Sequence, residues 1–392
     1  MNFKELENQY KSELLDNVLP FWLKHSLDTE CGGYFTCLDR DGSVFDTDKF
    51  IWLQGREVWL FSMLYNNVEK RQEWLDCAIS GGEFLRKYGH DGKYNWYFSL
   101  DREGNPLIEP YNIFSYTFAT MAFGQLSKAT GNDEYAEIAT KTFNIILSKL
   151  KNPKGKWNKA YDGTRNLKNF ALPMILCNLA LEIEHLLDKS LLNELMNNCI
   201  HEVMDVFLRP DLGGIIIENV TVDGNLSDTF DGRLVNPGHA IEAMWFIMDL
   251  GKRLNRPELI DKAVATTIKM IEYGWDKEHG GIFYFMDRLG CPPQQLEWDQ
   301  KLWWVHIETL ISLLKGYNLT GSQECLKWFE TIHNYTWTHF KDAEYPEWFG
   351  YLNRKGEVLL TLKGGKWKGC FHVPRGMYQC WKILEEINNK EV

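Results

Sequence analysis

Apolar residues recur at helical spacing along almost the whole chain and divide it into twelve stretches. A period of three to four residues places such side chains on one helix face, so each stretch predicts a helix. Breaks that contain glycine or proline, at 130–132, 255–257 and 320–321, separate the two helices of a pair. The predicted helices span approximately residues 3–25, 52–69, 71–88, 112–130, 132–150, 168–187, 189–207, 237–254, 256–274, 301–318, 321–340 and 372–388.

Short segments rich in glycine and aromatic residues recur between the helix pairs, about every 60 to 68 residues. Five of the six are followed by a second glycine turn, and alternating apolar and polar residues surround them. This combination is typical of short β-hairpins. The segments lie at 31–35, 91–94, 153–157, 212–215, 279–283 and 346–350, and the second turns at 41–42, 103–104, 223–224, 289–290 and 355–356.

Six helical hairpins with structured loops predict an all-α fold in which an inner layer of six helices is wrapped by an outer six. One such repeat cannot bury its apolar face alone, so neighbouring repeats must stack. We therefore expect a single (α/α)6-barrel domain over residues 1–392, with the hairpin loops at one end. An open superhelix of helix pairs is the alternative. In the closed ring, polar residues in the first turns of helices that follow the loops are the candidates for chemistry.

Composition restricts the classes of function. The 392 residues are 44% hydrophobic and 25% charged, as in a globular protein, and the net charge of −11 without a long basic run makes a nucleic-acid partner improbable. Nine scattered cysteines without a C-x-x-C pair indicate reduced thiols in a cytoplasmic protein. Neither a signal-peptide core nor a run of ~20 apolar residues is present, so we expect no membrane partner. The 16 Trp and 17 Tyr suit stacking on sugar rings.

The segment at 236–245 carries the most distinctive polar group. Proline and glycine precede a predicted helix whose first turn holds His239, and Glu242 and Trp245 follow at intervals of three residues. The three side chains therefore share one face near a helix N-terminus. Such a face can form a polar site with an aromatic wall, although a His–Glu surface pair beside a core tryptophan is the structural alternative.

Two further helix starts have similar character. Arg56 lies in an apolar, aromatic segment, where a guanidinium can stabilise an anion or pair with a carboxylate. Lys301, Trp304 and Glu308 are spaced to share one face of the helix that we predict at 301–318, whereas His306 points away and is expected to be structural.

A Gly/Lys-rich loop at 363–371 ends at His372 and Arg375, at the start of the last predicted helix. Two histidines on different helices, an arginine and two glutamates suit acid–base chemistry, because imidazole titrates near pH 6.5. The same residue types also ligate metals. No closely spaced ligand motif occurs, however, so we predict no metal site.

Six stretches extend over almost the whole chain in order: WLQGREVW (52–59), KNFALPMILCNL (168–179), NPGHAIEAMW (236–245), KLWWVHIE (301–308), EWFGYLNRKG (347–356) and KGCFHVPR (368–375). At these stretches the chain resembles the N-acylglucosamine 2-epimerase family. The resemblance implies an (α/α)6 barrel and an isomerase that interconverts N-acetyl-D-glucosamine and N-acetyl-D-mannosamine without a metal or redox cofactor. It also implies a homodimer, and stimulation by ATP, which some members show; the basic segments 152–156 and 363–368 are the candidate nucleotide contacts.

The family's site residues fall on positions of this chain that match its motifs. His239 and His372 match the acid/base pair, and Arg56 and Glu308 match residues that are essential for activity. Glu242 and Trp304 match pocket residues. On the same helix faces we expect substrate contacts from Trp245, Lys301 and Arg375.

The mechanism that the resemblance implies begins with opening of the sugar ring. One histidine removes the C2 proton to give an enediolate, Arg56 stabilises its charge, and the other histidine returns a proton to the opposite face. We assign His372 to the acetylglucosamine direction and His239 to the reverse.

Other functions remain open at this point. A cellobiose or mannose 2-epimerase, or an aldose–ketose isomerase, would use the same scaffold. Lys366-Trp367 stands where the acylglucosamine group typically has Pro-Phe, which puts the detail of this loop in doubt. A glycoside hydrolase or lyase would need two carboxylates, such as Glu308 with Glu242 or Asp231. A non-catalytic sugar-binding protein would have no need of the histidines.

Overall fold

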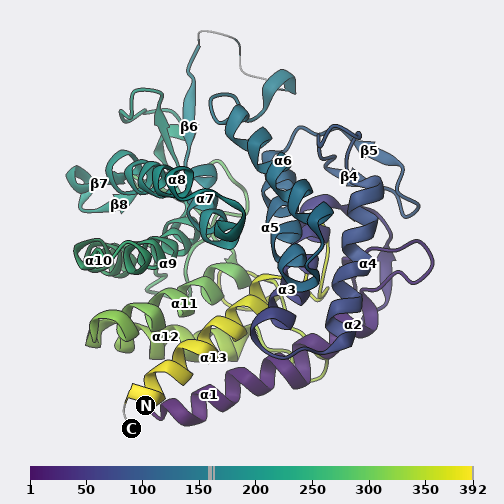
Figure 1. Cartoon of the computed structure of the whole chain (residues 1–392). Helices are drawn as coiled ribbons and strands as arrows, with labels where there is room; N and C mark the ends of the chain where they lie inside the picture. The colour runs from purple at the N-terminus through teal and green to yellow at the C-terminus, as the bar shows by residue number, and fades with distance from the viewer. Residues whose placement is uncertain (158–160, 162–163, 391–392) are drawn as a thin grey trace.

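Twelve helical segments form a ring two layers deep in the computed structural model, which describes residues 1–157, 161 and 164–390 (Figure 1). The first is α1 (Phe3–Ser12), which continues through a π-helical turn (Glu13–Val18) into α2 (Leu19–His25). The others are α3 (Ile51–Asn67), α4 (Gln72–Tyr88), α5 (Ile113–Thr130), α6 (Asp133–Lys149), α7 (Ala171–Glu182), α8 (Lys189–His201, extended by a π-helical turn), α9 (Pro237–Arg253), α10 (Pro257–Gly274), α11 (Trp303–Thr320), α12 (Gln323–His339) and α13 (His372–Lys390).

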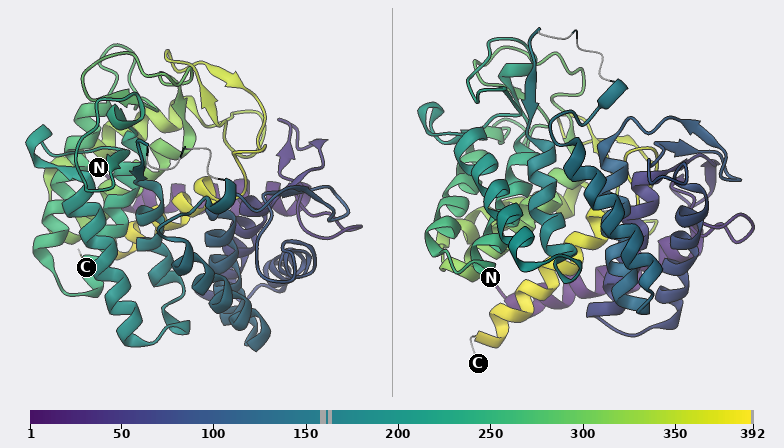
Figure 2. Two further views of the ribbon diagram at one scale, coloured as in Figure 1. Left: turned by 90° about the horizontal axis from the view of Figure 1, so that it is seen from above. Right: turned by 45° about the horizontal axis from the view of Figure 1, so that its top comes forward.

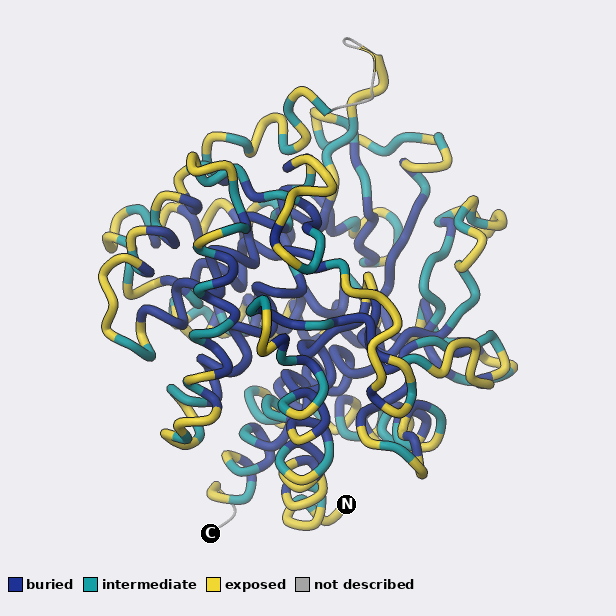
Figure 3. Tube along the Cα trace, turned by 90° about the vertical axis from the view of Figure 1, so that its right-hand side faces the viewer, coloured by how far each residue is buried: buried dark blue, intermediate teal, exposed yellow. Residues whose placement is uncertain are grey.

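The inner layer consists of α3, α5, α7, α9, α11 and α13, each packed against the next. In α3, α5 and α11 nearly every residue of the first four turns is buried, so these helices are apolar all round. Outer helices such as α4 and α10 bury the side chains of one face only. Figure 3 shows this as a dark-blue interior beneath exposed loops and outer turns. The (α/α)6 barrel predicted from the sequence is therefore confirmed.

Five helical hairpins are continuous in sequence, whereas the sixth combines the two ends of the chain. α1 packs along α13, and the two termini lie at the same end of this pair (Figures 1 and 2). The ring closes where Phe371, just before α13, packs its ring 5.3 Å from that of Trp59 in α3. Adding the last helix to the first thus completes the barrel.

Short strands occupy the long loops that lead from each outer helix to the next inner one, while the inner-to-outer connections are short. The strand before an inner helix pairs with a strand of a neighbouring loop: β3 with β4, β6 with β9, β10 with β11 and β12 with β13. The long loops therefore lie at one end of the ring, where these strand pairs join neighbouring loops. The strands are β1 (Cys37–Leu38), β2 (Val44–Asp46), β3 (Lys49–Phe50), β4 (Ser99–Leu100), β5 (Pro106–Ile108), β6 (Leu167–Asn169), β7 (Leu208–Arg209), β8 (Ile215–Ile216), β9 (Asn219–Thr221), β10 (Leu234–Val235), β11 (Met286–Asp287), β12 (Lys301–Leu302), β13 (Tyr351–Leu352) and β14 (Val358–Leu360).

Three of these loops repeat one ionic arrangement, which we call the rim clasp. An aspartate just after an outer helix binds a fully buried lysine near the end of the same loop and an arginine from another loop. The lysine also donates to a backbone carbonyl of its own loop. The clasps are Asp28–Lys49–Arg102, Asp276–Lys301–Arg354 and Asp342–Lys363–Arg40.

Two predicted helices were too long. The helix predicted at 168–187 begins only at Ala171, because 167–169 pairs with β9 and the Asn169 side chain accepts from the Ala171 N–H at 3.0 Å. The helix predicted at 301–318 begins at Trp303, because Lys301 and Leu302 pair with β13. Lys301 therefore does not share a helix face with Trp304 and Glu308, which corrects that prediction.

Candidate active site

The inner helices bring the sequence-predicted polar residues together at the loop-bearing end of the barrel. Each inner helix starts where a long loop ends, so its first turns lie at that end. Arg56 is in the second turn of α3, His239 in the first turn of α9, Glu308 in the second turn of α11, and His372 is the first residue of α13. The side chain of Asn236 caps α9 by accepting from the His239 N–H at 3.1 Å.

His372 belongs to a buried polar network that includes the carboxylates of Glu308 and Glu242. Its Nδ1 donates to Glu308 Oε1 at 2.8 Å. Arg375, one turn further along α13, donates through Nη2 to the same oxygen at 2.6 Å and also to Glu242. All four residues are buried. The guanidinium therefore neutralises two carboxylates that would otherwise repel each other, and Glu308 fixes the orientation of the imidazole.

His239 is held in the same manner by a different carboxylate. Its Nδ1 lies 3.1 Å from both oxygens of Glu218, which is buried in the loop between β8 and β9. The amide of Asn169 donates to the same carboxylate at 3.2 Å. Unlike Glu308, Glu218 has no guanidinium bound to it among the described residues.

Trp304 packs against both histidines. Its ring centroid is 5.3 Å from that of His239 and 5.8 Å from that of His372, and both ring pairs are tilted by 37°. No described residue hydrogen-bonds the Nε2 atom of either imidazole. Because Nδ1 is engaged in both, Nε2 is the nitrogen of each imidazole that remains free to exchange a proton, and both imidazoles lie against the same indole.

The two imidazoles have opposite electrostatic surroundings. Burial disfavours the charged form of His239, but the Glu218 carboxylate outweighs burial and raises the pKa of His239 above its ordinary value. For His372, burial and the nearby Arg56 cation together lower the pKa well below its ordinary value. At neutral pH, His372 is therefore suited to accept a proton and His239 to donate one.

Arg56 is a buried cation that no described residue hydrogen-bonds. Its guanidinium carbon lies 4.2 to 4.6 Å from the ring centroids of Trp52, Phe118 and Phe371. Burial and the neighbouring Arg375 lower the pKa of Arg56 to about 9. Cation–π contacts compensate in part for lost hydration, but the N–H donors remain available for an oxyanion.

The same carboxylates and His372 could also be considered as metal ligands. Glu242, Glu308 and His372 each offer a ligand atom, and these atoms lie within 4.8 Å of one another. Arg375, however, already binds both carboxylates through one nitrogen. A divalent cation would have to displace a buried guanidinium, so this donor set does not fit a resident metal.

Several sequence-predicted residues lie away from this network. Lys301 is buried in a rim clasp with Asp276 at 3.1 Å. Lys363 and Lys368 are buried in ion pairs with Asp342 and Glu347, which removes both from the proposed nucleotide contacts. His306 is structural, as expected: Nδ1 donates to the Leu302 carbonyl, Nε2 accepts from the Ile282 N–H, and burial lowers its pKa to about 3.

Glu218 was not recognised from the sequence. The sequence marks Glu218 only by its position, as a single acidic residue directly after the apolar run 215–217 near a predicted hairpin loop. A carboxylate at such a position is buried and needs a partner. Which partner it finds depends on how the loop folds over α9, and this contact is not local in sequence.

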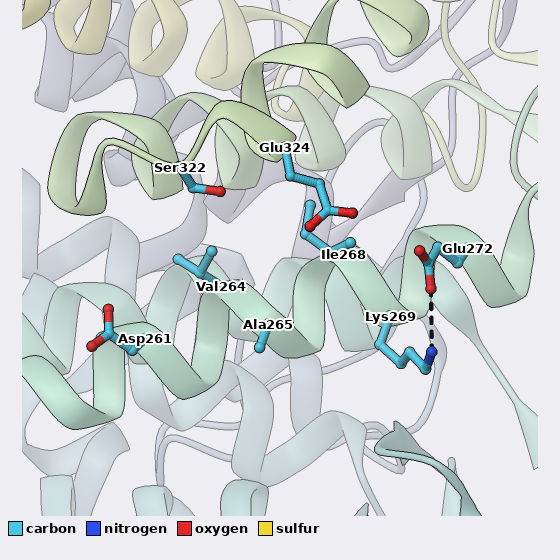
Figure 4. A pocket seen from close by; sticks show the side chains of 8 residues that line it. All are labelled: Asp261, Val264, Ala265, Ile268, Lys269, Glu272, Ser322 and Glu324. Carbon is cyan, nitrogen blue, oxygen red and sulfur yellow. Dashed lines mark hydrogen bonds and ion pairs between the residues drawn. The ribbon is translucent and has the colours of Figure 1, made fainter.

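A surface groove elsewhere on the molecule is separate from this network. It lies between outer helix α10 and the N-terminal end of α12, and its polar lining is mainly acidic, with Lys269 paired to Glu272 at 3.2 Å (Figure 4). No residue of the histidine network lines it. Among the described residues, no helix is both long and apolar enough to cross a bilayer.

Comparisons with known proteins identify relatives of the whole chain and of its fold. The family model described as N-acylglucosamine 2-epimerase (GlcNAc 2-epimerase) matches residues 33–374. N-acylglucosamine 2-epimerase of Mus musculus is 42% identical over 383 residues, which cover 94% of this chain and 90% of that protein. Cellobiose 2-epimerase of Eubacterium cellulosolvens is 24% identical over 405 residues, covering 95% and 96%. The structure of a cellobiose 2-epimerase from Bacillus thermoamylovorans superimposes with a TM-score of 0.83 at 21% identity, covering 97% of this chain and 99% of that one.

Proposed function

The chain belongs to the N-acylglucosamine 2-epimerase family, and from this premise we propose that it interconverts N-acetyl-D-glucosamine and N-acetyl-D-mannosamine. The observation that carries the proposal is the pair of histidines. Each is held at Nδ1 by a buried carboxylate, and each leaves Nε2 free beside the same indole. Inversion at one carbon by proton transfer needs an acid and a base on opposite faces of that carbon, which this pair would provide.

The proposed reaction starts from the open-chain sugar, whose C1 aldehyde acidifies the C2 proton. In the acetylglucosamine direction, Nε2 of His372 removes this proton. Because C2 of an amino sugar carries nitrogen, the intermediate is the C1–C2 enolate, with its charge on the C1 oxygen, and not a true enediolate. His239 then donates a proton to the other face of C2. The reverse direction exchanges the two roles.

Arg56 and the buried carboxylates have different parts in this mechanism. Arg56 is the cation whose N–H groups no described residue engages, so we assign it to the enolate oxygen. Glu308 and Glu218 orient the imidazoles and favour the tautomer with the proton on Nδ1. Glu242 holds Arg375 against Glu308.

Two alternatives have less support. A cellobiose or mannose 2-epimerase, or an aldose–ketose isomerase, would use similar chemistry, but identity to the cellobiose enzyme is 24%, against 42% to the N-acylglucosamine enzyme. A glycoside hydrolase needs carboxyl groups at least ~5 Å apart on either side of a glycosidic bond. Glu242 and Glu308 instead share one guanidinium nitrogen, and Asp231 is exposed on the surface.

The test is proton NMR of the purified protein with N-acetyl-D-mannosamine, with cellobiose and mannose in parallel. The proposal predicts N-acetyl-D-glucosamine as the product and much slower conversion of the neutral sugars. Preferred conversion of cellobiose or mannose would contradict it, and a ketose product would indicate an isomerase. Undiminished activity in EDTA is expected, because Arg375 occupies the position that a metal would take.

We further propose, from the family resemblance, that the protein is a cytoplasmic homodimer that ATP stimulates. Size-exclusion chromatography with light scattering measures the first, and the NMR assay with and without ATP measures the second. With Lys363 and Lys368 buried in ion pairs, the exposed Lys366 is the remaining basic residue of the 363–368 loop for a nucleotide contact.

A further inference from the structure

Among the described residues, no hydrogen bond or ring contact joins Trp245 to His239 or His372. Its ring is among the most fully buried large side chains of the protein, and its Nε1–H donates to Glu308 Oε2 at 2.9 Å. The other oxygen of Glu308 accepts from His372 and Arg375. Trp245 therefore contacts the carboxylate on the side away from the imidazole.

Two cationic side chains, Lys315 and Arg375, lie against the Trp245 ring. Lys315 Nζ lies 4.5 Å from the Trp245 ring centroid, and the Arg375 guanidinium carbon lies 5.3 Å from it. Lys315 is held by both oxygens of Asp249, at 2.6 and 2.7 Å. Lys315 follows Glu308 by seven residues on α11, and Asp249 follows Trp245 by four on α9, so the contacts form a ladder between two adjacent inner helices.

We propose that Trp245 is a positioning residue that acts on His372 through Glu308, and not a substrate contact. The indole N–H fixes the rotation of the Glu308 carboxylate, so that Oε1 meets Nδ1 of His372. The Lys315 cation over the ring polarises the N–H and strengthens its bond to the carboxylate. This inference rests on the proposed function, since it assigns how one of the two bases is held.

The test is Trp245→Phe, which keeps a large aromatic ring and removes only the N–H and the second ring. Glu308 then loses one of its donors and holds His372 less firmly, so kcat is expected to fall by roughly 10- to 100-fold with KM within about twofold of the parent. One donor fewer also leaves the negative charge of Glu308 less shared, so it stabilises the imidazolium form of His372 more strongly. The acid limb of kcat/KM in the acetylglucosamine direction, which reports the pKa of His372, is therefore expected to move to higher pH.

Two variants separate positioning from general destabilisation. Trp348→Phe removes a matched bond, from a fully buried indole to the buried carboxylate of Glu13 at 2.8 Å, and no hydrogen bond or ring contact joins Trp348 to either histidine among the described residues. It is expected to lower the melting temperature and to leave kcat and the pH profile unchanged. Lys315→Met keeps the indole and removes the cation, so a smaller change in the same direction as in Trp245→Phe is expected.

A raised KM with unchanged kcat in Trp245→Phe would make Trp245 a substrate contact and overturn the inference. An unchanged kcat and pH profile in both Trp245→Phe and Lys315→Met would overturn it as well. These outcomes require an active parent enzyme. Absence of epimerase activity in the parent would instead contradict the proposed function itself.

Discussion

At the scale of single residues, the site contains two histidines whose electrostatic environments are opposite. His239 is bound to an unneutralised carboxylate, whereas Arg375 has already neutralised the carboxylate that holds His372, and Arg56 lies nearby. The first arrangement raises the pKa of an imidazole and the second lowers it. Pairs of titratable groups separated in this way are typical of acid–base partners.

The pH dependence follows from these directions. In the acetylglucosamine direction the free enzyme needs neutral His372 and protonated His239. We expect kcat/KM to fall on the acid side with a pKa below 6.5, as His372 gains its proton, and on the alkaline side with a pKa above 6.5, as His239 loses one. An initial-rate pH profile measures both limbs. An acid limb above 6.5, or rates that stay level through the alkaline range, would disagree with this assignment.

Glu218→Gln tests the carboxylate that sequence reasoning missed. The amide keeps the shape of the side chain but has no charge, so the pKa of His239 falls and the alkaline limb is expected to move to lower pH, with kcat lower on the order of 100-fold. Glu13→Gln, in a buried carboxylate on the first helix, serves as the control and should leave the profile unchanged. The assignment fails if Glu218→Gln has a normal alkaline limb.

Arg56 and Arg375 are expected to respond in opposite ways to loss of charge. Arg56→Met removes a buried cation without hydrogen bonds to the described residues, so kcat should fall about 10²- to 10³-fold while stability is unchanged or higher. Arg375→Met leaves Glu242 and Glu308 without their shared partner and should cost about 3–5 kcal/mol. Steady-state kinetics and urea unfolding measure the two effects. Strong destabilisation by Arg56→Met would indicate an ionic partner for it.

The sequence located most of these residues because they lie in the first turns of predicted helices and within motifs shared with a known family. It did not determine what they contact. Glu218 contacts His239 only because its loop folds over the start of α9. The hydrogen bond between Trp245 and Glu308 joins residues of two different helices that are 63 positions apart in the chain. Such contacts depend on packing between repeats, which local spacing does not encode.

At the scale of elements, the loops matter as much as the helices, because the rim clasps hold the loops that lead into three inner helices, α3, α11 and α13. Helical periodicity predicted all twelve helices, but it extended one of them over Lys301. The pattern carries no sign that this residue enters strand β12 and that its ammonium group is buried beside Asp276. Helix ends set by strand pairing or by buried ion pairs are therefore the part of the fold that periodicity predicts least well.

Breaking one clasp should be costly. Asp342→Asn leaves the fully buried Lys363 without its carboxylate, and we expect the free energy of unfolding to fall by about 3–5 kcal/mol. Arg40→Gln removes the partly exposed member of the same clasp and should cost much less, because solvent screens its charge. Chemical denaturation measures both values. An equal loss of unfolding free energy in the two variants would show that the buried Asp342–Lys363 pair contributes no more to stability than the partly exposed Arg40.

At the scale of the whole molecule, the ring places α9 and α13 close enough for His239 and His372 to meet beside Trp304, although they are 133 residues apart. The repeat pattern predicted this closed ring and the end at which the site lies. It did not show that the sixth hairpin is made from the two chain ends, since only the packing of α1 along α13 establishes that pairing. The central proposal is that these two histidines act as bases on opposite faces of one substrate carbon.

The most direct test follows C2 hydrogen exchange by proton NMR in D2O for His239→Asn and His372→Asn with each epimer. If each histidine serves one face, His239→Asn exchanges the C2 proton of N-acetyl-D-glucosamine only, His372→Asn that of N-acetyl-D-mannosamine only, and neither converts one sugar into the other. Conversion at a near-normal rate by either variant, or exchange of both epimers by one of them, would contradict the two-base account.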